Sequence, residues 1–206
     1  MTKRFFDIVA ASIGLVVLSP LLVVCAVYVK LDSKGPVFFR QIRVGLRGST
    51  FRIHKFRTMV DNAEADGEQI TAARDIRITE CGAILRRYKL DELPQLIDVL
   101  LGHMSLVGPR PEVPRFIAHV PEPVRSVILS VRPGITDMAS VHFRDESALL
   151  SGANNADYYI GVILPQKLRY YVDYVNQQSF WLDMKIILLT FGVLLQRTQP
   201  VAKVGK

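Results

Sequence analysis

Two adjacent carboxylates, Asp91 and Glu92, follow a cluster of basic residues in the segment RRYKLDELPQL. Arginine side chains grip phosphoryl oxygens through paired N–H donors, so this segment suits a phosphorylated substrate. Neighbouring residues on a helix point about 100° apart, so the two carboxylates cannot face each other across one bond and need different roles. One can attack phosphorus as a nucleophile while the other helps to hold Mg²⁺, which shields the phosphate charge.

The same carboxylates also have a purely structural interpretation. If a helix starts at Asp91, this residue is the N-cap, and Pro94 falls in the first turn, where a missing amide donor costs little. Carboxylates there complement the helix dipole. A helix N-terminus is equally a site where phosphate binds, so the sequence leaves both interpretations open.

Basic residues are placed where they can hold phosphate. Arg86, Arg87 and Lys89 lie just upstream of the carboxylates and add positive charge, while Arg110 and Arg132 lie on two further turns, GPRP and VRPG. Proline restricts the backbone of both turns. We therefore expect Arg110 and Arg132 to bind phosphoryl oxygens.

Composition narrows the class of protein. The chain has 206 residues, a formal net charge of +7 and 50% hydrophobic residues, which allows one domain plus a membrane anchor. We assign residues 1–33 to the anchor and residues 34–206 to a cytosolic catalytic domain. No nucleic-acid partner is expected, because no helix-turn-helix, zinc or stacking motif accompanies the charge. A non-catalytic adaptor that binds anionic lipid is a rival, but the basic residues lie on turns beside carboxylates and not in one run.

The segment from Ile8 to Val29 carries no charge and is long enough to span a bilayer, which takes about 20 residues. Ser19 and Pro20 interrupt it at the middle, where proline is expected to bend a helix. Each half would rise only about 15 Å, half of the ~30 Å hydrocarbon layer. Basic residues flank both ends, which favours the cytoplasmic side for each. A re-entrant hairpin and a kinked spanning helix both fit these observations.

For the remainder we expect a mainly helical α+β fold. Alternating residues on both sides of Gly45–Gly48 predict a short β-hairpin, in which Lys55 and Arg57 share a face. The other expected elements are a short helix and loop over 60–75, a helix from Asp91 to Gly102, an ordered loop or a turn leading into a helix over 104–116, an amphipathic helix over 115–130 and helices over 165–197. Near the C-terminus, aromatic residues such as Trp181 lie close to basic ones, which favours an interfacial amphipathic helix; a core helix is the alternative.

Read in order, the motifs KRFFD, SP, GPVFFRQIRVG, KFRTM, DIRIT, LRR, LDELPQL, GHMSLVGPRPE, RPGIT and LDMKIILLT resemble those of bacterial polyprenyl-phosphate phosphoglycosyltransferases. The resemblance covers nearly the whole chain and is to the small monotopic kind. It implies transfer of a sugar 1-phosphate from a UDP-sugar to undecaprenyl phosphate with release of UMP. This would be the first membrane step in assembling a bacterial polysaccharide or glycoprotein glycan.

The resemblance also implies a ping-pong mechanism with Mg²⁺. Asp91 matches the nucleophile that takes the phospho-sugar covalently, and Glu92 matches its metal-associated partner, so both are expected at the metal. Arg86 matches an arginine ahead of the nucleophile, and Arg110 matches the phosphate-binding arginine of Pro-Arg-Pro. Lys55 and Arg57 match KFR and are expected to bind substrate phosphate.

Ser19 and Pro20 match the helix break of a re-entrant anchor, which makes the hairpin the preferred topology. The expected location is then the lipid bilayer of the bacterial inner membrane, with the catalytic domain facing the cytoplasm.

One departure from the family pattern is Asp137, which stands where many relatives have glycine after Pro-Gly-Ile-Thr. The identity of the sugar is therefore left open, as are the pathway and the choice between monomer and homodimer. A conventional glycosyltransferase is a closer rival than an adaptor, but the chain has neither a G-x-G-x-x-G turn nor an Asp-x-Asp motif. That rival would release UDP in place of UMP.

Overall fold

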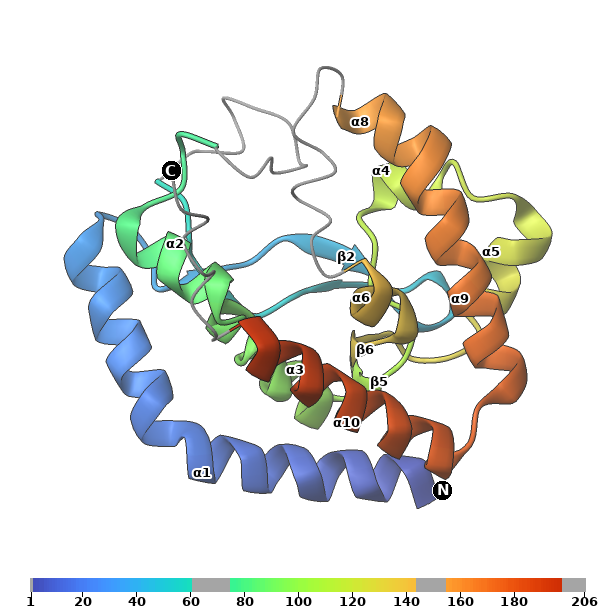
Figure 1. Ribbon diagram of the computed structural model, residues 1–206, viewed down its shortest axis with the longest axis horizontal. Coiled ribbons are helices and arrows are strands. Elements are labelled where there is room, and N and C mark those ends of the chain that lie inside the picture. Colours follow the sequence, from blue (N-terminus) through green and yellow to red (C-terminus); the bar gives the residue numbers. More distant parts are fainter. Residues whose placement is uncertain (1, 61–74, 144–154, 198–206) are drawn as a thin grey trace, which may run out of the picture.

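The computed structural model describes residues 2–60, 75–143 and 155–197. Short strands and many helices form a body that one long N-terminal helix, α1 (Thr2–Asp32), borders on two sides (Figure 1). The mainly helical α+β class is confirmed. Most of the polar segment expected to hold a helix and loop, 60–75, lies outside the described residues.

The predicted break in α1 takes the form of a bend within one continuous helix, visible near its middle in Figure 1. Pro20 removes the backbone donor that would have bonded the carbonyl of Val16. The hydroxyl of Ser19 donates to that same carbonyl at 2.8 Å and so satisfies it. The Ser-Pro pair therefore bends the helix without leaving this acceptor unpaired.

Both ends of α1 are bonded to the body. At the start, Arg4 donates to the carbonyl of Val99 at 2.7 Å, and the buried Asp7 accepts from Ser105 Oγ at 2.8 Å. At the end, Asp32 accepts a bond from the backbone N–H of Cys81 at 3.2 Å. The bent helix is thus tied to the same body at its two termini.

The predicted hairpin is confirmed. Its strands are β1 (Phe38–Phe39), β2 (Ile42–Val44), β3 (Thr50–Arg52) and β4 (Lys55–Phe56). β1 pairs with β4 and β2 with β3, both antiparallel and in one continuous register. The tip is a 3₁₀ turn, η1 (Leu46–Gly48), in which Gly48 adopts a φ of 79°.

A short parallel pair joins β5 (Ser105–Val107) to β6 (Gly134–Thr136), although the sequence predicted only a loop or turn over 104–116. A Cβ on Gly134 would lie 2.1 Å from the backbone N of Gly108, so this close approach requires glycine. The pair fixes the start of the proline-rich loop that carries Arg110. The prediction of a loop or turn was therefore wrong at β5. The local sequence could not predict this strand because its pairing partner, β6, is distant in sequence.

The remaining described elements are helical: α2 (Glu80–Arg87), η2 (Leu90–Glu92), α3 (Gln95–Leu101), α4 (Pro114–Ile117), α5 (Glu122–Ile128), α6 (Met138–His142), α8 (Asn155–Tyr158), the π-turn η3 (Tyr159–Ile163), α9 (Leu164–Gln177) and α10 (Phe180–Arg197). The single helix expected over 115–130 was wrong, because the chain turns at Pro121 and divides it into α4 and α5. The expected stop of the preceding helix at Gly102 is confirmed. The largest core cluster joins α4, α5, α6 and α9.

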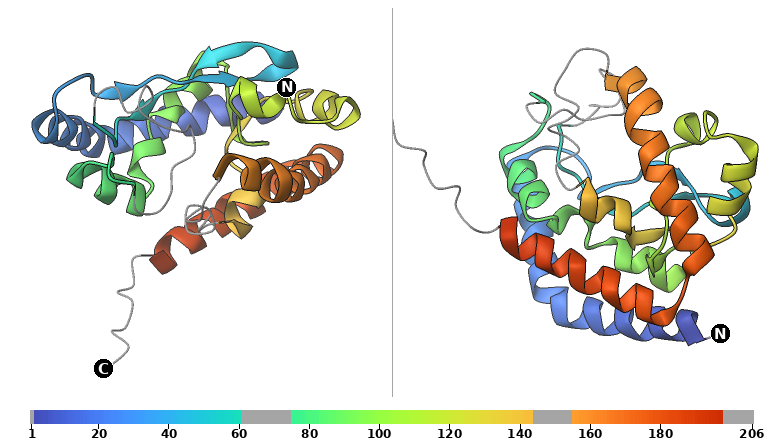
Figure 2. Two further views of the ribbon diagram at one scale, coloured as in Figure 1. Left: turned by 90° about the horizontal axis from the view of Figure 1, so that it is seen from above. Right: turned by 45° about the vertical axis from the view of Figure 1, so that its right-hand side comes forward.

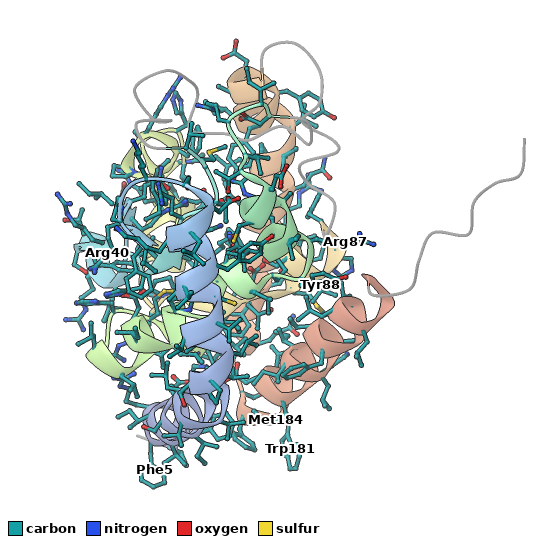
Figure 3. All side chains as sticks on the ribbon, turned by 90° about the vertical axis from the view of Figure 1, so that its left-hand side faces the viewer. Phe5, Arg40, Arg87, Tyr88, Trp181 and Met184 are labelled. Atoms are coloured by element: carbon teal, nitrogen blue, oxygen red, sulfur yellow. The ribbon has the colours of Figure 1, made fainter. Side chains whose placement is uncertain are left out.

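α10 lies alongside the first half of α1 (Figures 1 and 2), where Lys3 pairs with the buried Asp183 and Phe6 packs edge-on against Phe180. Its inner face includes the fully buried Ile186. The large side chains of α10 that remain mostly exposed are Trp181, Leu188, Phe191 and Leu195. In Figure 3, Trp181 and Phe5 of α1 project from the same end of the molecule. α10 therefore combines a core face with an exposed apolar face.

Candidate active site

The backbone around the two carboxylates differs from the predicted helix cap. Lys89 adopts a left-handed φ of 57°, a 3₁₀ turn follows over Leu90–Glu92, and α3 begins only at Gln95. Asp91 is 2% exposed, and its Oδ2 lies 2.8 Å from Lys55 Nζ. Its Oδ1 is buried and has no hydrogen-bond partner. Asp91 is therefore not an N-cap, and the prediction that a helix starts there is wrong.

Glu92 is surrounded by positive charge. Arg110 donates to both of its carboxylate oxygens, from Nη1 at 3.1 Å and from Nη2 at 2.5 Å, and Lys55 Nζ lies 3.3 Å from Oε1. Burial alone would raise the pKa of Glu92, but the charges of Arg110, Lys55 and Lys89 hold it well below its usual value. Glu92 is thus an anion, and Lys55 bridges it to Asp91.

Arg86 reaches the carboxylates from α2. Its Nε donates to Thr58 Oγ1 at 2.8 Å, and its guanidinium interacts electrostatically with Asp91 and Glu92. α2 packs closely on the segment after β4 at Gly82, where a Cβ would lie 2.1 Å from the carbonyl oxygen of Thr58. This contact holds α2, and with it Arg86, against the segment that carries Thr58.

The loop that carries Arg110 is held from behind. Arg43 Nη1 donates to the carbonyl of Pro111 at 2.9 Å, and Val44 N donates to that of Glu112 at 2.9 Å. The buried Glu112 side chain accepts from Tyr159 Oη at 2.7 Å. Burial alone would raise the pKa of Glu112, but the charges of Lys167 and Arg43 hold it below its usual value.

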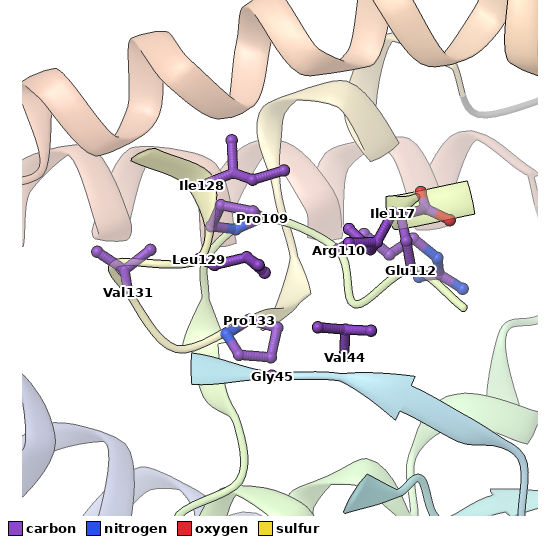
Figure 4. Close-up of a pocket in the computed structure, with 10 residues that line it drawn as sticks. All are labelled: Val44, Gly45, Pro109, Arg110, Glu112, Ile117, Ile128, Leu129, Val131 and Pro133. Carbon is purple, nitrogen blue, oxygen red and sulfur yellow. The ribbon is translucent and has the colours of Figure 1, made fainter. Parts of the chain in front are cut away.

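Two pockets adjoin this loop. One is an apolar pocket between β2, the loop and α5 (Figure 4), where the charged ends of Arg110 and Glu112 lie on the side away from Leu129 and Val131. The other lies beside the carboxylates and is lined by Phe39, Arg43, Ile53, Lys55, Gln95, Arg110 and Pro111. The second pocket has cationic walls, so it suits an anionic substrate group.

Two predicted phosphate-binding residues are not brought to this cluster. Arg57 donates from Nη2 to the carbonyl of Ser33 at 2.8 Å and from Nη1 to that of Lys34, just beyond the end of α1. The backbone pairing continues in register at Arg57, whose N–H donates to Val37 O at 2.9 Å, but the two carbonyl contacts hold its side chain away from the carboxylates. Arg132 donates to the carbonyl of Gly102, at the end of α3 that is remote from Asp91.

Two residues of the site were missed by sequence reasoning. Thr58 binds Arg86, and Gln95 is buried in the wall of the cationic pocket. Thr58 lies in the motif KFRTM and Gln95 in the motif LDELPQL, and their places in these motifs could have marked them as site residues. Asp137, singled out as a departure from the family, caps α6 through bonds from Ser140 N at 2.9 Å and Ser140 Oγ at 2.5 Å.

An acidic pair among cations, one carboxylate oxygen of which is unpartnered, defines a site suited to phosphoryl transfer. Comparison with known proteins agrees with this class. Residues 1–197 match the family model described as "Bacterial sugar transferase". The chain therefore belongs to the bacterial sugar transferase family.

Several curated relatives have more specific names. The chain is 39% identical over 201 residues to the UDP-glucose:undecaprenyl-phosphate glucose-1-phosphate transferase of Caulobacter vibrioides, covering 95% of this chain and 70% of the relative. It is 41% identical to the enzyme of the same name from Klebsiella pneumoniae, over 91% of this chain and 39% of the relative. It is 38% identical to the UDP-N-acetylgalactosamine-undecaprenyl-phosphate N-acetylgalactosaminephosphotransferase of Aeromonas hydrophila, over 94% of this chain and 43% of the relative. The chain spans less than half the length of the latter two.

Proposed function

We propose that this protein transfers a sugar 1-phosphate from a UDP-sugar to undecaprenyl phosphate and releases UMP. The names of the relatives support both substrates, and they differ in the sugar, which is left open for this chain. The observation that carries the mechanism is the buried, unpartnered Oδ1 of Asp91 beside a set of cations.

In the proposed first step, a carboxylate oxygen of Asp91 attacks the phosphorus that bears the sugar. A bond forms between this oxygen and phosphorus, and the bond from phosphorus to the oxygen of UMP breaks. In the second step, a phosphate oxygen of undecaprenyl phosphate attacks the same phosphorus and frees Asp91. The products are UMP and the lipid-linked diphosphate sugar, and Asp91 is a carboxylate again.

The cations make attack of one anion on another feasible. Arg110 and Lys55 are already held at Glu92, and Arg86 interacts electrostatically with both carboxylates. Positive groups fixed before the reaction stabilise charge on the transferring phosphoryl group without reorganisation. Lys55 also holds one oxygen of Asp91, which leaves the other oriented as the nucleophile.

Mg²⁺ belongs to the same proposal. Protein sites for this ion commonly supply one or two carboxylates, while substrate phosphates and water complete the octahedron. Asp91 and Glu92 fit that donor set, and the lowered pKa of Glu92 keeps this carboxylate in the ionised form that a cation requires. Within the described ranges no group of three or more His, Cys, Asp or Glu could hold a metal, so these two carboxylates would depend on substrate phosphate. When bound, the ion would neutralise diphosphate charge.

We further propose that α1 enters the cytoplasmic leaflet of the bacterial inner membrane as a re-entrant helix. In the described part of the chain, α1 is the one helix long and apolar enough to cross a membrane. Its two ends are both bonded to the body, through Arg4 and Asp32, which supports a topology with both ends on one side of the ~30 Å hydrocarbon layer. The exposed apolar face of α10 would then lie at the interface.

Product analysis tests the proposed reaction. The protein, in detergent or bilayer discs, is incubated with undecaprenyl phosphate, Mg²⁺ and each of a panel of UDP-sugars. The proposal requires UMP as the nucleotide product from at least one of them. Release of UDP would identify a conventional glycosyltransferase, and no nucleotide release from any sugar would favour the adaptor.

A further inference from the structure

A buried carboxylate on α3 has both of its oxygens bonded to one residue of the hairpin. Asp98 is fully buried, and its Oδ1 lies 2.7 Å from His54 Nδ1. Its Oδ2 accepts a bond from the backbone N–H of His54, also at 2.7 Å. His103 Nδ1 is 3.9 Å from Oδ1, outside hydrogen-bond range. Asp98 thus binds the side chain and the backbone of His54 together.

The register of the hairpin explains why His54 offers its backbone N–H. Ile53 N donates to Gln41 O at 3.0 Å, and Arg57 N donates to Val37 O at 2.9 Å, so these odd-numbered residues face the partner arm. Alternate residues of an antiparallel arm point their N–H groups the other way. The N–H of His54 therefore lies on the open edge, where a buried unpaired donor would be costly and Asp98 satisfies it.

The contact with Arg40 fixes the proton on the imidazole. Arg40 Nη1 lies 2.6 Å from His54 Nε2. A guanidinium has no acceptor, so Nε2 must accept this bond, and the ring proton is on Nδ1. In this tautomer Nδ1 donates to Asp98.

His54 immediately precedes Lys55, and Asp98 belongs to the helix that follows Asp91. The structure therefore contains a closed ring: Lys55 is bonded to Asp91 at one point, and His54 is bonded to Asp98 farther along the same segment. Lysine has a long flexible stem that does not fix its own position. The second attachment fixes the backbone from which that stem extends.

We propose that Asp98 and His54 are positioning residues that hold the Lys55 ammonium between the two catalytic carboxylates. The inference rests on the proposed function. Asp98 lies beside the apolar cluster of Ala11, Phe51, Ile53, Val99 and Met104, where a charge is costly to bury and an apolar residue could pack α3 against the hairpin equally well. What an apolar pair could not provide is the two directional bonds that fix the strand before Lys55.

Rates of UMP release test the coupling. His54→Phe keeps a ring but removes the donor, and it should lower kcat at least tenfold. His54→Asn has an amide N–H near the position of Nδ1 and should recover most of that loss. In a Lys55→Met background, His54→Phe should cost less than a further twofold, because residues acting through one group are not additive. Additive losses would overturn the proposal.

A core variant on the same helix separates positioning from stability. Val99→Ala truncates a fully buried apolar neighbour of Asp98 and should lower the melting temperature while leaving kcat near wild type. If it lowers kcat as much as His54→Phe does, the role of His54 is only structural. Should His54→Phe fail to fold, Asp98→Asn serves instead. Its side-chain oxygen can still accept from the backbone N–H of His54, but its NH₂ group faces the imidazole N–H, so that bond is lost.

A readout without substrate distinguishes failure of this inference from failure of the proposed function. Acetylation of surface lysines followed by peptide mass spectrometry reports how well Lys55 is held by its carboxylates. Lys55 should be protected in the wild type, His54→Asn and Val99→Ala, and at least threefold more reactive in His54→Phe or Asp98→Asn. If Lys55 is as protected from acetylation in a folded variant as in the wild type, the positioning role of Asp98 and His54 is overturned, even if UMP is released. If the wild type releases no UMP, the proposed function fails, but acetylation still tests whether Asp98 and His54 position Lys55.

Discussion

Arg110 holds both carboxylate oxygens of Glu92, at 3.1 and 2.5 Å, through the two terminal nitrogens of its guanidinium. Glu92 therefore fills the fork formed by the two terminal nitrogens of Arg110. A phosphoryl group presents the same pair of oxygens to an arginine, so diphosphate can take the place of this carboxylate. We therefore propose that this ion pair marks the position where Arg110 binds the diphosphate of the substrate.

The first prediction tests this fork. Arg110→Lys keeps the charge but provides a single ammonium in place of two parallel N–H donors. We expect kcat/KM for the UDP-sugar to fall at least tenfold, with the melting temperature changed by only a few degrees. Steady-state UMP release and thermal unfolding in the same detergent measure the two effects. Full activity with lysine would reduce Arg110 to a general electrostatic role.

The second prediction concerns pH and Glu112. The folded-state pKa of this residue lies below its ordinary value of 4.5, so its ionised form stabilises the fold at pH values above 4.5. That contribution is lost as pH falls through the folded pKa. Glu112→Gln should therefore cost about 2–4 kcal/mol at pH 7, where it leaves Lys167 buried beside a neutral group, and less at pH 3.5, below the ordinary pKa of the carboxyl.

Asp137 provides the opposite control. Burial raises its pKa, so ionisation disfavours the fold above that pKa, and the penalty disappears as pH falls. Asp137→Asn keeps a good helix cap. Its loss in free energy of unfolding should be smallest at pH 7, where the substitution can even give a net gain in stability. Denaturant unfolding at both pH values measures the differences. An equal loss for Glu112→Gln at both values would disprove the assigned charge interactions.

The third prediction concerns the close contact at Gly82. A Cβ there would meet the carbonyl oxygen of Thr58 at 2.1 Å, and because this atom belongs to the backbone, α2 must move. Gly82→Ala should destabilise the protein by about 1–3 kcal/mol and lower activity by displacing Arg86. Gly192 in α10 has open space around it, so Gly192→Ala is a matched helical control that should stabilise by up to about 1 kcal/mol. Two variants with the same stability would refute this packing argument.

The fourth prediction concerns topology. A cysteine placed at residue 2 should be unreactive to an impermeant thiol reagent in intact cells and should react after permeabilisation. Labelling in intact cells would show that the N-terminus is outside and that α1 spans the membrane. Replacing Ser19 by Ala and Pro20 by Leu restores the backbone donor to Val16 and should straighten α1. In part of the molecules α1 would then span the membrane, and the cysteine at residue 2 would be labelled from outside the cell. An unchanged pattern would show that the bend does not determine topology.

Linked motifs predicted which residues form the site, and local rules were less successful for the backbone. Asp91, Glu92, Lys55, Arg86 and Arg110 do come together. The cap predicted at Asp91 was wrong because Lys89 adopts a left-handed conformation, which nothing in a lysine signals.

Other differences have tertiary causes. Arg57 is diverted by two carbonyls beyond the end of α1, and β5 forms because a strand distant in sequence pairs with it. The division between α4 and α5 did have a local signal in Pro121, which the apolar spacing of 115–130 obscured. Nothing in the local sequence predicted the two bonds between His54 and Asp98, since an isolated histidine is more often a packing residue than part of a site.

The central claim, that Asp91 is the nucleophile, is first tested by substitution. Asp91 caps no helix, and its Oδ1 has no partner, so Asp91→Asn removes little beyond the ion pair with Lys55. An amide is a far poorer nucleophile than a carboxylate. We expect turnover to fall by about three orders of magnitude or more, with the melting temperature little changed.

The most direct measurement is of the covalent intermediate itself. The protein is incubated with a reactive UDP-sugar and Mg²⁺ but without undecaprenyl phosphate, quenched, digested and analysed by mass spectrometry, with Asp91→Asn as the matched control. The account predicts a burst of UMP stoichiometric with enzyme and a phospho-sugar on the peptide that contains Asp91, both absent from the variant. A stoichiometric burst with no adduct, or an adduct on another residue, would contradict the assignment of Asp91 as the nucleophile.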